Sequence, residues 1–108
     1  MARKLPAPFA YATATSINTA PDGTVAVRYH RTDVCTLHPD GTVTLRTGGW
    51  QTVTTKRRIN QALRCFGVPA LVYQRRHDWY VAPFGGDGVE FCDGMRLRVN
   101  GHGVECAA

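Results

Sequence analysis

The side chains best suited to chemistry lie in one short stretch, residues 48–58, which contains two glycines, a tryptophan, threonines and three consecutive cations. A helix capped by Thr54 or Thr55 would begin here, and the free backbone N–H groups of a helix N-terminus bind anions. The helix dipole disfavours each cation in the first turn by roughly 0.3–1 kcal/mol, so helix stability alone does not explain residues 56–58. The stretch therefore predicts a site for an anionic partner.

Charge and aromatic chemistry extend this prediction. Residues 51–80 carry six Lys or Arg residues against the single acid Asp78, and concentrated positive charge attracts polyanions. Trp50 is suited to stack on a nucleobase, which contributes about 1–3 kcal/mol per base in single-strand binders. We therefore expect nucleic acid or a nucleotide as the partner. The predicted binding residues are Gly49, Trp50, Thr54, Thr55, Lys56, Arg57, Arg58, Arg64, Arg75 and Arg76.

Two other interpretations of these residues stay open. In the first, Thr54 and Thr55 only cap the helix, Trp50 fills the core, and the cations are solvated. In the second, the chain binds a host protein, because Trp, Tyr and Arg are enriched at binding hot spots. The aromatic residues of that surface would be Trp50, Tyr73, Trp79, Tyr80 and Phe84. A virion accessory subunit, which would need extensive self-association, is a further alternative.

Zinc-like spacings occur, but they do not predict a metal site. Cys35 and His38 are three residues apart, and on a strand these positions point to opposite faces. His102 and Cys106, with Cys92, would have to converge with them in tetrahedral geometry. We expect no bound metal and no cofactor.

Catalytic groups are equally incomplete. His30 lies near Asp33, His77 is beside Asp78, and Cys65 is a possible nucleophile. No third group completes a nucleophile, base and orienter set around any of them. We therefore expect no enzymatic activity.

The 108 residues suffice for one domain with a modest core, so we predict a single domain over 1–108 with a loose N-terminal arm at 1–10. The apolar runs are far too short to span a membrane. The first residues include two cations but no apolar region after them, so we expect no secretory signal. The four cysteines contain no Cys-x-x-Cys pair. Reduced thiols in a bacterial cytoplasm are the expected state.

The elements that must position the site begin with a repeated turn motif. Pro-Asp-Gly-Thr-Val occurs at residues 21–25 and again at 39–43, and Pro-Asp-Gly favours a tight turn. Alternation after the second copy turns Val43 and Leu45 inward, and Thr42, Thr44 and Arg46 outward. Two consecutive hairpins follow, with strands at about 11–18, 24–31, 33–38 and 42–47.

An amphipathic helix follows at about 55–65. Ile59, Ala62, Leu63 and Phe66 form one apolar stripe at helical spacing, and Gly67 is typical of a helix end. Alternation then predicts a hairpin of residues 71–74 and 79–82, and another of 89–92 and 95–99 around an Asp-Gly turn at 93–94. The fold class is α+β, with a mostly antiparallel sheet built from successive hairpins and one central helix.

Residues 32–43 (TDVCTLHPDGTV) and 48–60 (GGWQTVTTKRRIN), with 72–75 and 79–81, resemble a family of small proteins encoded by bacteriophages, especially those of actinobacteria. The resemblance covers roughly residues 28–84. It implies a phage gene product that works inside the cytoplasm of an infected bacterium. It implies no catalytic residue, because no established chemistry accompanies the motif.

Overall fold

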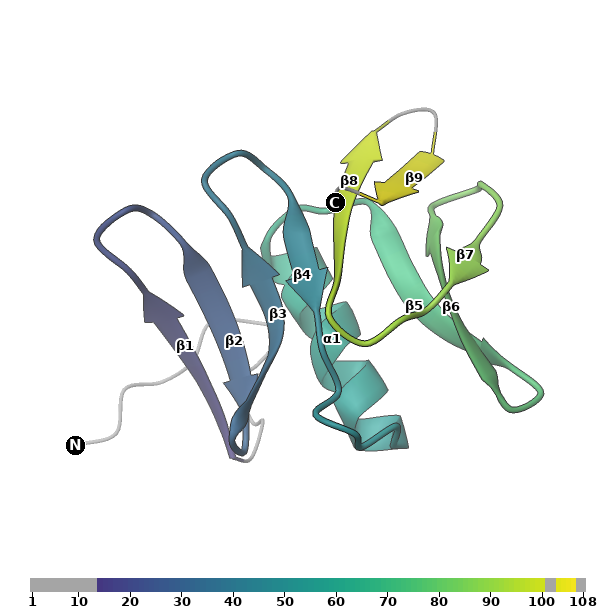
Figure 1. Ribbon diagram of the computed structural model, residues 1–108, viewed down its shortest axis with the longest axis horizontal. Coiled ribbons are helices and arrows are strands. Elements are labelled where there is room, and N and C mark those ends of the chain that lie inside the picture. The colour runs from purple at the N-terminus through teal and green to yellow at the C-terminus, as the bar shows by residue number, and fades with distance from the viewer. Residues whose placement is uncertain (1–13, 101–102, 107–108) are drawn as a thin grey trace.

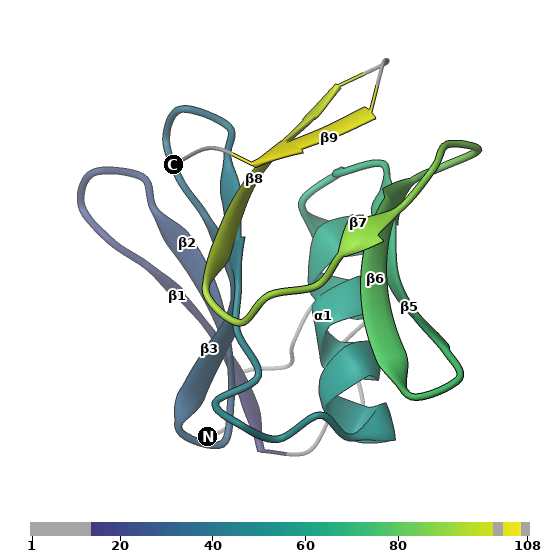
Figure 2. The same ribbon diagram turned by 45° about the vertical axis from the view of Figure 1, so that its right-hand side comes forward.

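The computed structural model describes residues 14–100 and 103–106, and this part of the chain forms two antiparallel sheets and one helix. The strand order is β1-β2-β3-β4-β8-β9 in the larger sheet and β5-β6-β7 in the smaller (Figure 1). Figure 2 shows α1 between the two sheets. The α+β prediction is confirmed. The elements are β1 (Thr15–Thr19), β2 (Val25–Tyr29), β3 (Thr32–Leu37), β4 (Val43–Leu45), α1 (Val53–Cys65), β5 (Ala70–Arg75), β6 (Asp78–Pro83), β7 (Val89–Glu90), β8 (Met95–Asn100) and β9 (Gly103–Cys106).

The first two hairpins form as predicted, and their turns share one structure. Asp22 accepts a hydrogen bond from the backbone N–H of Thr24 (2.9 Å), and Asp40 accepts the equivalent bond from Thr42 (2.9 Å). The glycine that follows each Asp has a positive φ of 94° or 87°, which glycine adopts without strain. The predicted arm and residues 11–13 of the first strand lie outside the described residues.

The predicted hairpin around residues 93–94 is wrong. β7 pairs with β6, whereas β8 pairs with β4 and β9, so the chain passes from one sheet to the other between them. The Asp93 carboxylate accepts hydrogen bonds from the backbone N–H (3.0 Å) and hydroxyl of Thr47, and the N–H of Gly94 donates to Leu45 O (2.7 Å). These contacts attach the start of β8 to the end of β4.

The helix buries the predicted stripe. Ile59, Ala62 and Leu63 are buried in the core, and Phe66 packs partly buried against it. The helix ends as predicted, because Gly67 has a φ of 71° and the N–H of Val68 donates back to Leu63 O (2.9 Å). This is the bond pattern of a glycine-terminated helix.

The side chain of Asn60 connects the helix to the middle of β5. Asn60 Nδ2 donates to Val72 O (2.9 Å), and Asn60 Oδ1 accepts from the N–H of Val72 (2.7 Å). Val72 is buried and belongs to the core. The amide of Asn60 therefore satisfies both backbone groups of one residue and fixes the position of the smaller sheet on α1.

The outward face of the larger sheet is polar, as predicted, but two of its threonines are buried. Thr42 accepts a hydrogen bond from Arg96 Nε (2.7 Å), and Thr44 is hydrogen-bonded to His38 (2.7 Å). The bonds from Thr42 and the nearby Arg96 lower the pKa of Asp40 to about 2. Arg96 can cover Thr42, because the apolar stem of an arginine can lie on a sheet while its charge stays in water.

Candidate anion-binding site

The helix that carries the candidate site begins earlier than predicted. Thr52, not Thr54 or Thr55, is the N-cap, and its hydroxyl accepts a hydrogen bond from the N–H of Thr55 (3.1 Å). Arg57 therefore lies in the second turn. The dipole acts mainly within the first turn, so the predicted electrostatic penalty does not apply to Arg57 and Arg58. The expectation that helix stability alone cannot explain these cations is therefore wrong for both of them.

The three consecutive cations point in three directions, because successive residues of an α-helix are about 100° apart. Lys56 extends toward the smaller sheet, where its Nζ lies 3.4 Å from Gln74 Oε1 and 5.8 Å from the ring of Trp79. Arg57 is exposed. They do not form one patch with Arg58.

Arg58 is buried and contacts other residues of the domain. It is 7% exposed. Its guanidinium donates to Thr15 Oγ1 (3.1 Å) and Gln61 Oε1 (2.9 Å) and lies 5.6 Å from the ring of Tyr29. A cation over an aromatic ring with two hydrogen bonds is engaged by the protein itself, so Arg58 is not available as predicted.

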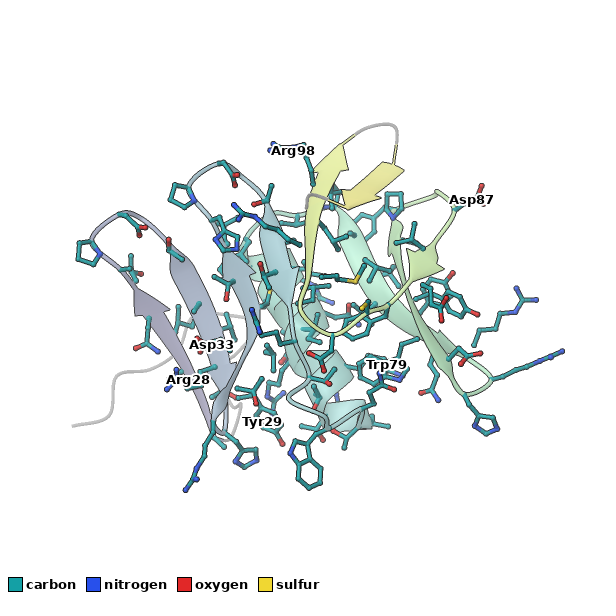
Figure 3. The ribbon with its side chains drawn as sticks, in the orientation of Figure 1. Arg28, Tyr29, Asp33, Trp79, Asp87 and Arg98 are labelled. Carbon is teal, nitrogen blue, oxygen red and sulfur yellow. The ribbon has the colours of Figure 1, made fainter. Side chains whose placement is uncertain are left out.

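Arg57 and Arg64 lie on the outer face of α1, along an open groove of about 360 Å³ that also includes Lys56. Among the side chains that the structure describes, which are those of residues 14–99, the ion pairs are Arg28–Asp33, both labelled in Figure 3, and Arg96–Asp40. Both pairs lie on the larger sheet. Arg57 and Arg64 have no carboxylate partner in this part of the chain. Their charge is therefore available to an external anion.

The tip of the β5–β6 hairpin supplies two further exposed arginines, Arg75 and Arg76. Gln74 connects this tip to the start of α1, because it accepts from Lys56 Nζ and donates to Arg76 O (3.0 Å). The tip and the helix start lie at the same end of the molecule in both views (Figures 1 and 2). The structure thus brings together cations separated by about twenty residues.

The loop before the helix is held in place at Thr47. Thr47 Oγ1 accepts from the N–H of Gly49 (3.1 Å) and itself donates to Asp93. Gly48 and Gly49 have φ values of 65° and 87°, and a Cβ on Gly48 would lie 2.3 Å from Thr32 Oγ1. Glycine at position 48 therefore permits the close approach that brings the loop beside the start of β3.

A cavity of about 630 Å³ opens between this loop and the β2–β3 turn. Trp50 lines it and is 71% exposed, so Trp50 does not fill the core. Thr55 lines it but Thr54 does not. The lining residues are Tyr29, His30, Arg31, Thr32, Val34, Thr47, Trp50, Thr52 and Thr55.

The cavity wall formed by residues 29–32 was missed by sequence reasoning. His30 and Arg31 form the β2–β3 turn, and His30 has a φ of 55°, a value that side chains other than glycine rarely adopt. Arg76, at the β5–β6 turn, has a φ of 59°. The sequence signal for this wall was a short turn, between two alternating segments, that contains neither Gly nor Asn.

We call the surface formed by these two turns, the loop before α1 and the start of α1 the basic end. It comprises His30, Arg31, Trp50, Lys56, Arg57, Arg75 and Arg76.

Asp93 makes the loop sensitive to acid. Burial raises its pKa, but the hydrogen bonds from Thr47 and Gly49 and the charge of Arg46 outweigh burial and lower the pKa below its ordinary value. A lowered pKa stabilises the fold above the unfolded value of about 3.9, and this contribution is lost as pH falls through the folded pKa. We expect Asp93→Ala to cost about 1 kcal/mol at neutral pH, with this difference from the unsubstituted protein shrinking below about pH 4.

Urea denaturation of both proteins at several pH values measures this difference. Asp87→Ala, which removes an exposed carboxylate from the loop before β7, is the matched control at neutral pH and should have little effect. A difference between Asp93→Ala and the unsubstituted protein that stays constant down to pH 2 would contradict the assigned role of Asp93.

The large aromatic residues do not form one surface. Trp79 is 5% exposed and packs edge-on against Phe91, with ring centroids 5.5 Å apart. Tyr73 and Tyr80 stack on each other, also at 5.5 Å. Phe84 is exposed, but its N–H donates to Pro69 O beyond the C-terminal end of α1, far from Trp50.

The described residues also bear on the other expectations. Cys35 is buried, and His38 is hydrogen-bonded to Thr44. Among the described side chains of residues 14–99, no three His, Cys, Asp or Glu groups are placed to hold a metal. His102 lies outside the described residues. Within the part of the chain that the structure describes, no helix has the length and apolar character needed to cross a membrane.

The chain is similar to one family of known proteins. A family model described as Kyanoviridae Gp96 protein matches residues 6–98, which is most of the chain. No curated protein and no solved structure matches significantly.

Proposed function

Because the chain belongs to the Kyanoviridae Gp96 protein family, which is encoded by bacteriophages, we propose that it is a phage accessory protein that binds nucleic acid through the basic end. The supporting observation is the convergence of Arg57, Arg75 and Arg76 from two elements at one end of the molecule, without carboxylate partners in the described residues. Their guanidinium groups suit phosphate, which they can bind in a bidentate manner.

The charge of the chain also favours a polyanionic partner. Its net charge is +5, and a positively charged protein attracts polyanions and encounters them faster. The two Pro-Asp-Gly turns lie at the end opposite the basic end (Figure 1), where Arg96 pairs with Asp40 (3.0 Å). Arg57, Arg75 and Arg76 form no such ion pair among the described side chains.

We expect Arg57→Ala/Arg75→Ala/Arg76→Ala to weaken nucleic-acid binding by more than about tenfold. Each lost phosphate contact also reduces the slope of log affinity against log salt by roughly 0.7–0.9. Fluorescence anisotropy with labelled single-stranded and duplex oligonucleotides, over a range of salt concentrations, measures both effects. Arg58 is left unchanged because it is buried.

The matched control removes one charge from the opposite end of the molecule. Arg98→Ala changes an exposed arginine of β8 at that end (Figure 3), and should reduce affinity by no more than about twofold through long-range charge alone. Equal losses from Arg98→Ala and Arg76→Ala would contradict a specific role for the basic end. Absence of binding by the unsubstituted protein at low salt would contradict the proposal itself.

A host protein is the second candidate partner, and one observation favours it. Trp50 and Val53 flank the N-cap and are 71% and 65% exposed, and a large exposed aromatic beside an arginine is typical of binding hot spots. Capture of one stoichiometric protein from nuclease-treated lysate, lost in Trp50→Ala, would favour this candidate. We also propose that the protein works in the cytoplasm of the host and comes from a phage of actinobacteria. Self-association in a virion is a further proposal.

A further inference from the structure

We propose that the cavity beside Trp50 holds one unpaired nucleobase with its attached phosphate, so that the basic end selects single strands over duplexes. This inference rests on the proposed nucleic-acid binding and adds the class of nucleic acid. The cavity measures about 630 Å³, within the range of ordinary small-ligand sites. It lies between two separate loops, so residues of the β2–β3 turn line it together with residues at the N-terminus of α1.

The walls of the cavity suit a flat aromatic ligand. Trp50 lines the cavity on the side of the loop, and Tyr29 and His30 line it on the side of the β2–β3 turn. The ring centroids of Tyr29 and His30 are 4.3 Å apart. Tyr29 lies in the lower part of the view in Figure 3, at the basic end. Exposed aromatic rings stack on bases of any sequence, since every base has a π-face. In a duplex the bases are already stacked, so an unpaired base enters such a site at lower cost.

The charge and polar groups of the cavity favour the same ligand. Arg31 lines it, and no Asp or Glu does among the described residues. The lining also includes the buried Val34 and the hydroxyl of Thr32. A hydroxyl both donates and accepts hydrogen bonds, so the Thr32 hydroxyl fits the edges of different bases. The ligand is therefore aromatic and anionic, with little base preference.

The backbone at His30 gives independent support. Its φ of 55° would be adopted more easily by glycine, and the turns at the opposite end have Gly23 and Gly41 at their positive-φ positions. His30 has an imidazole that lines the cavity, where glycine would supply only the backbone. Strain kept at a surface turn indicates that the side chain has a use.

Two substitutions in the full chain test the inference. Trp50→Ala should weaken binding of labelled oligothymidylate of about 12 nucleotides by about tenfold or more, and binding of a duplex of equal length by about twofold or less. His30→Gly should weaken single-strand binding severalfold while leaving thermal stability unchanged or raised, because it removes the strain. A structural role for His30 predicts a loss of stability instead.

Further probes distinguish the sources of the base. Oligouridylate separates RNA from DNA, and free thymidine monophosphate tests whether a single nucleotide suffices. Quenching of the exposed Trp50 indole by any of these supports the cavity, since the other tryptophan is buried. Equal effects of Trp50→Ala on single strands and duplexes would overturn the inference and leave the proposed function standing. No binding of either form by the unsubstituted protein would overturn both.

Discussion

Replacing Asn60 with alanine is expected to lower the free energy of unfolding by about 2–5 kcal/mol. Two hydrogen bonds join the Asn60 amide to the backbone of Val72, and Val72 is 1% exposed. A buried polar group left unsatisfied costs about 1–3 kcal/mol, and the substitution leaves both the N–H and the C=O of Val72 without this partner. Denaturation by urea, followed by circular dichroism, gives the value.

Two further variants separate the hydrogen bonds from other effects of changing the helix. Arg64→Ala alters an exposed position of the same helix and should change stability by no more than about 0.5 kcal/mol. Asn60→Asp keeps an acceptor for the N–H of Val72 but loses the donor to its C=O, so a partial loss is expected. If Asn60→Ala were as stable as Arg64→Ala, the contact between α1 and β5 would not be energetically important.

The second large effect is expected from Arg58→Ala, at about 2–4 kcal/mol of stability. The substitution removes two hydrogen bonds from a charged donor, and such a bond contributes about 1.5–3 kcal/mol net. The two contributions are not fully additive, because both bonds come from one guanidinium. It also removes the contact with the ring of Tyr29. Thermal or chemical denaturation measures the loss.

Its neighbour is the natural control. Arg57→Ala changes an exposed position to the residue of highest helix propensity, so stability should stay within about 0.5 kcal/mol. Arg58→Lys keeps the charge but lacks the planar fork, and it should recover only part of the loss. Equal stability of Arg57→Ala and Arg58→Ala would show that burial of Arg58 contributes nothing.

The buried position of Arg58 also determines which arginines can be replaced in a binding test. Replacing residues 56–58 together would combine a structural arginine with two accessible cations, so lower affinity could follow from a damaged fold. Arginines 57, 75 and 76 avoid this ambiguity, because each is exposed. Sequence proximity grouped the three cations, whereas helical geometry separates them.

Local sequence signals predicted most of the fold correctly. The two Pro-Asp-Gly turns, the helical stripe and the glycine-terminated helix each depend on residues close together in the chain. The Asp-Gly at 93–94 also carries a local turn signal, but Asp93 bonds to Thr47, 46 residues away. A non-local contact of this kind leaves no pattern in the neighbouring sequence, so the division into two sheets could not be predicted.

The candidate site was predicted in part for the same reason. Trp50, Arg57 and the arginines at the hairpin tip could be selected by residue type, and the structure places them at one end of the molecule. The opposite wall of the cavity could not be selected, because it forms only when the β2–β3 turn meets the loop before α1. The N-cap was misassigned because several nearby threonines could serve, and only tertiary contacts choose Thr52.

The amide of Asn60 has a consequence beyond stability. β5 is an edge strand, and its unpaired backbone groups are the kind of template on which strands of other molecules assemble into aggregates. By occupying the N–H and C=O at the centre of this strand, Asn60 makes the edge unsuitable for extension by intermolecular pairing. Pairing of another strand at the centre of the β5 edge would therefore have to displace this amide.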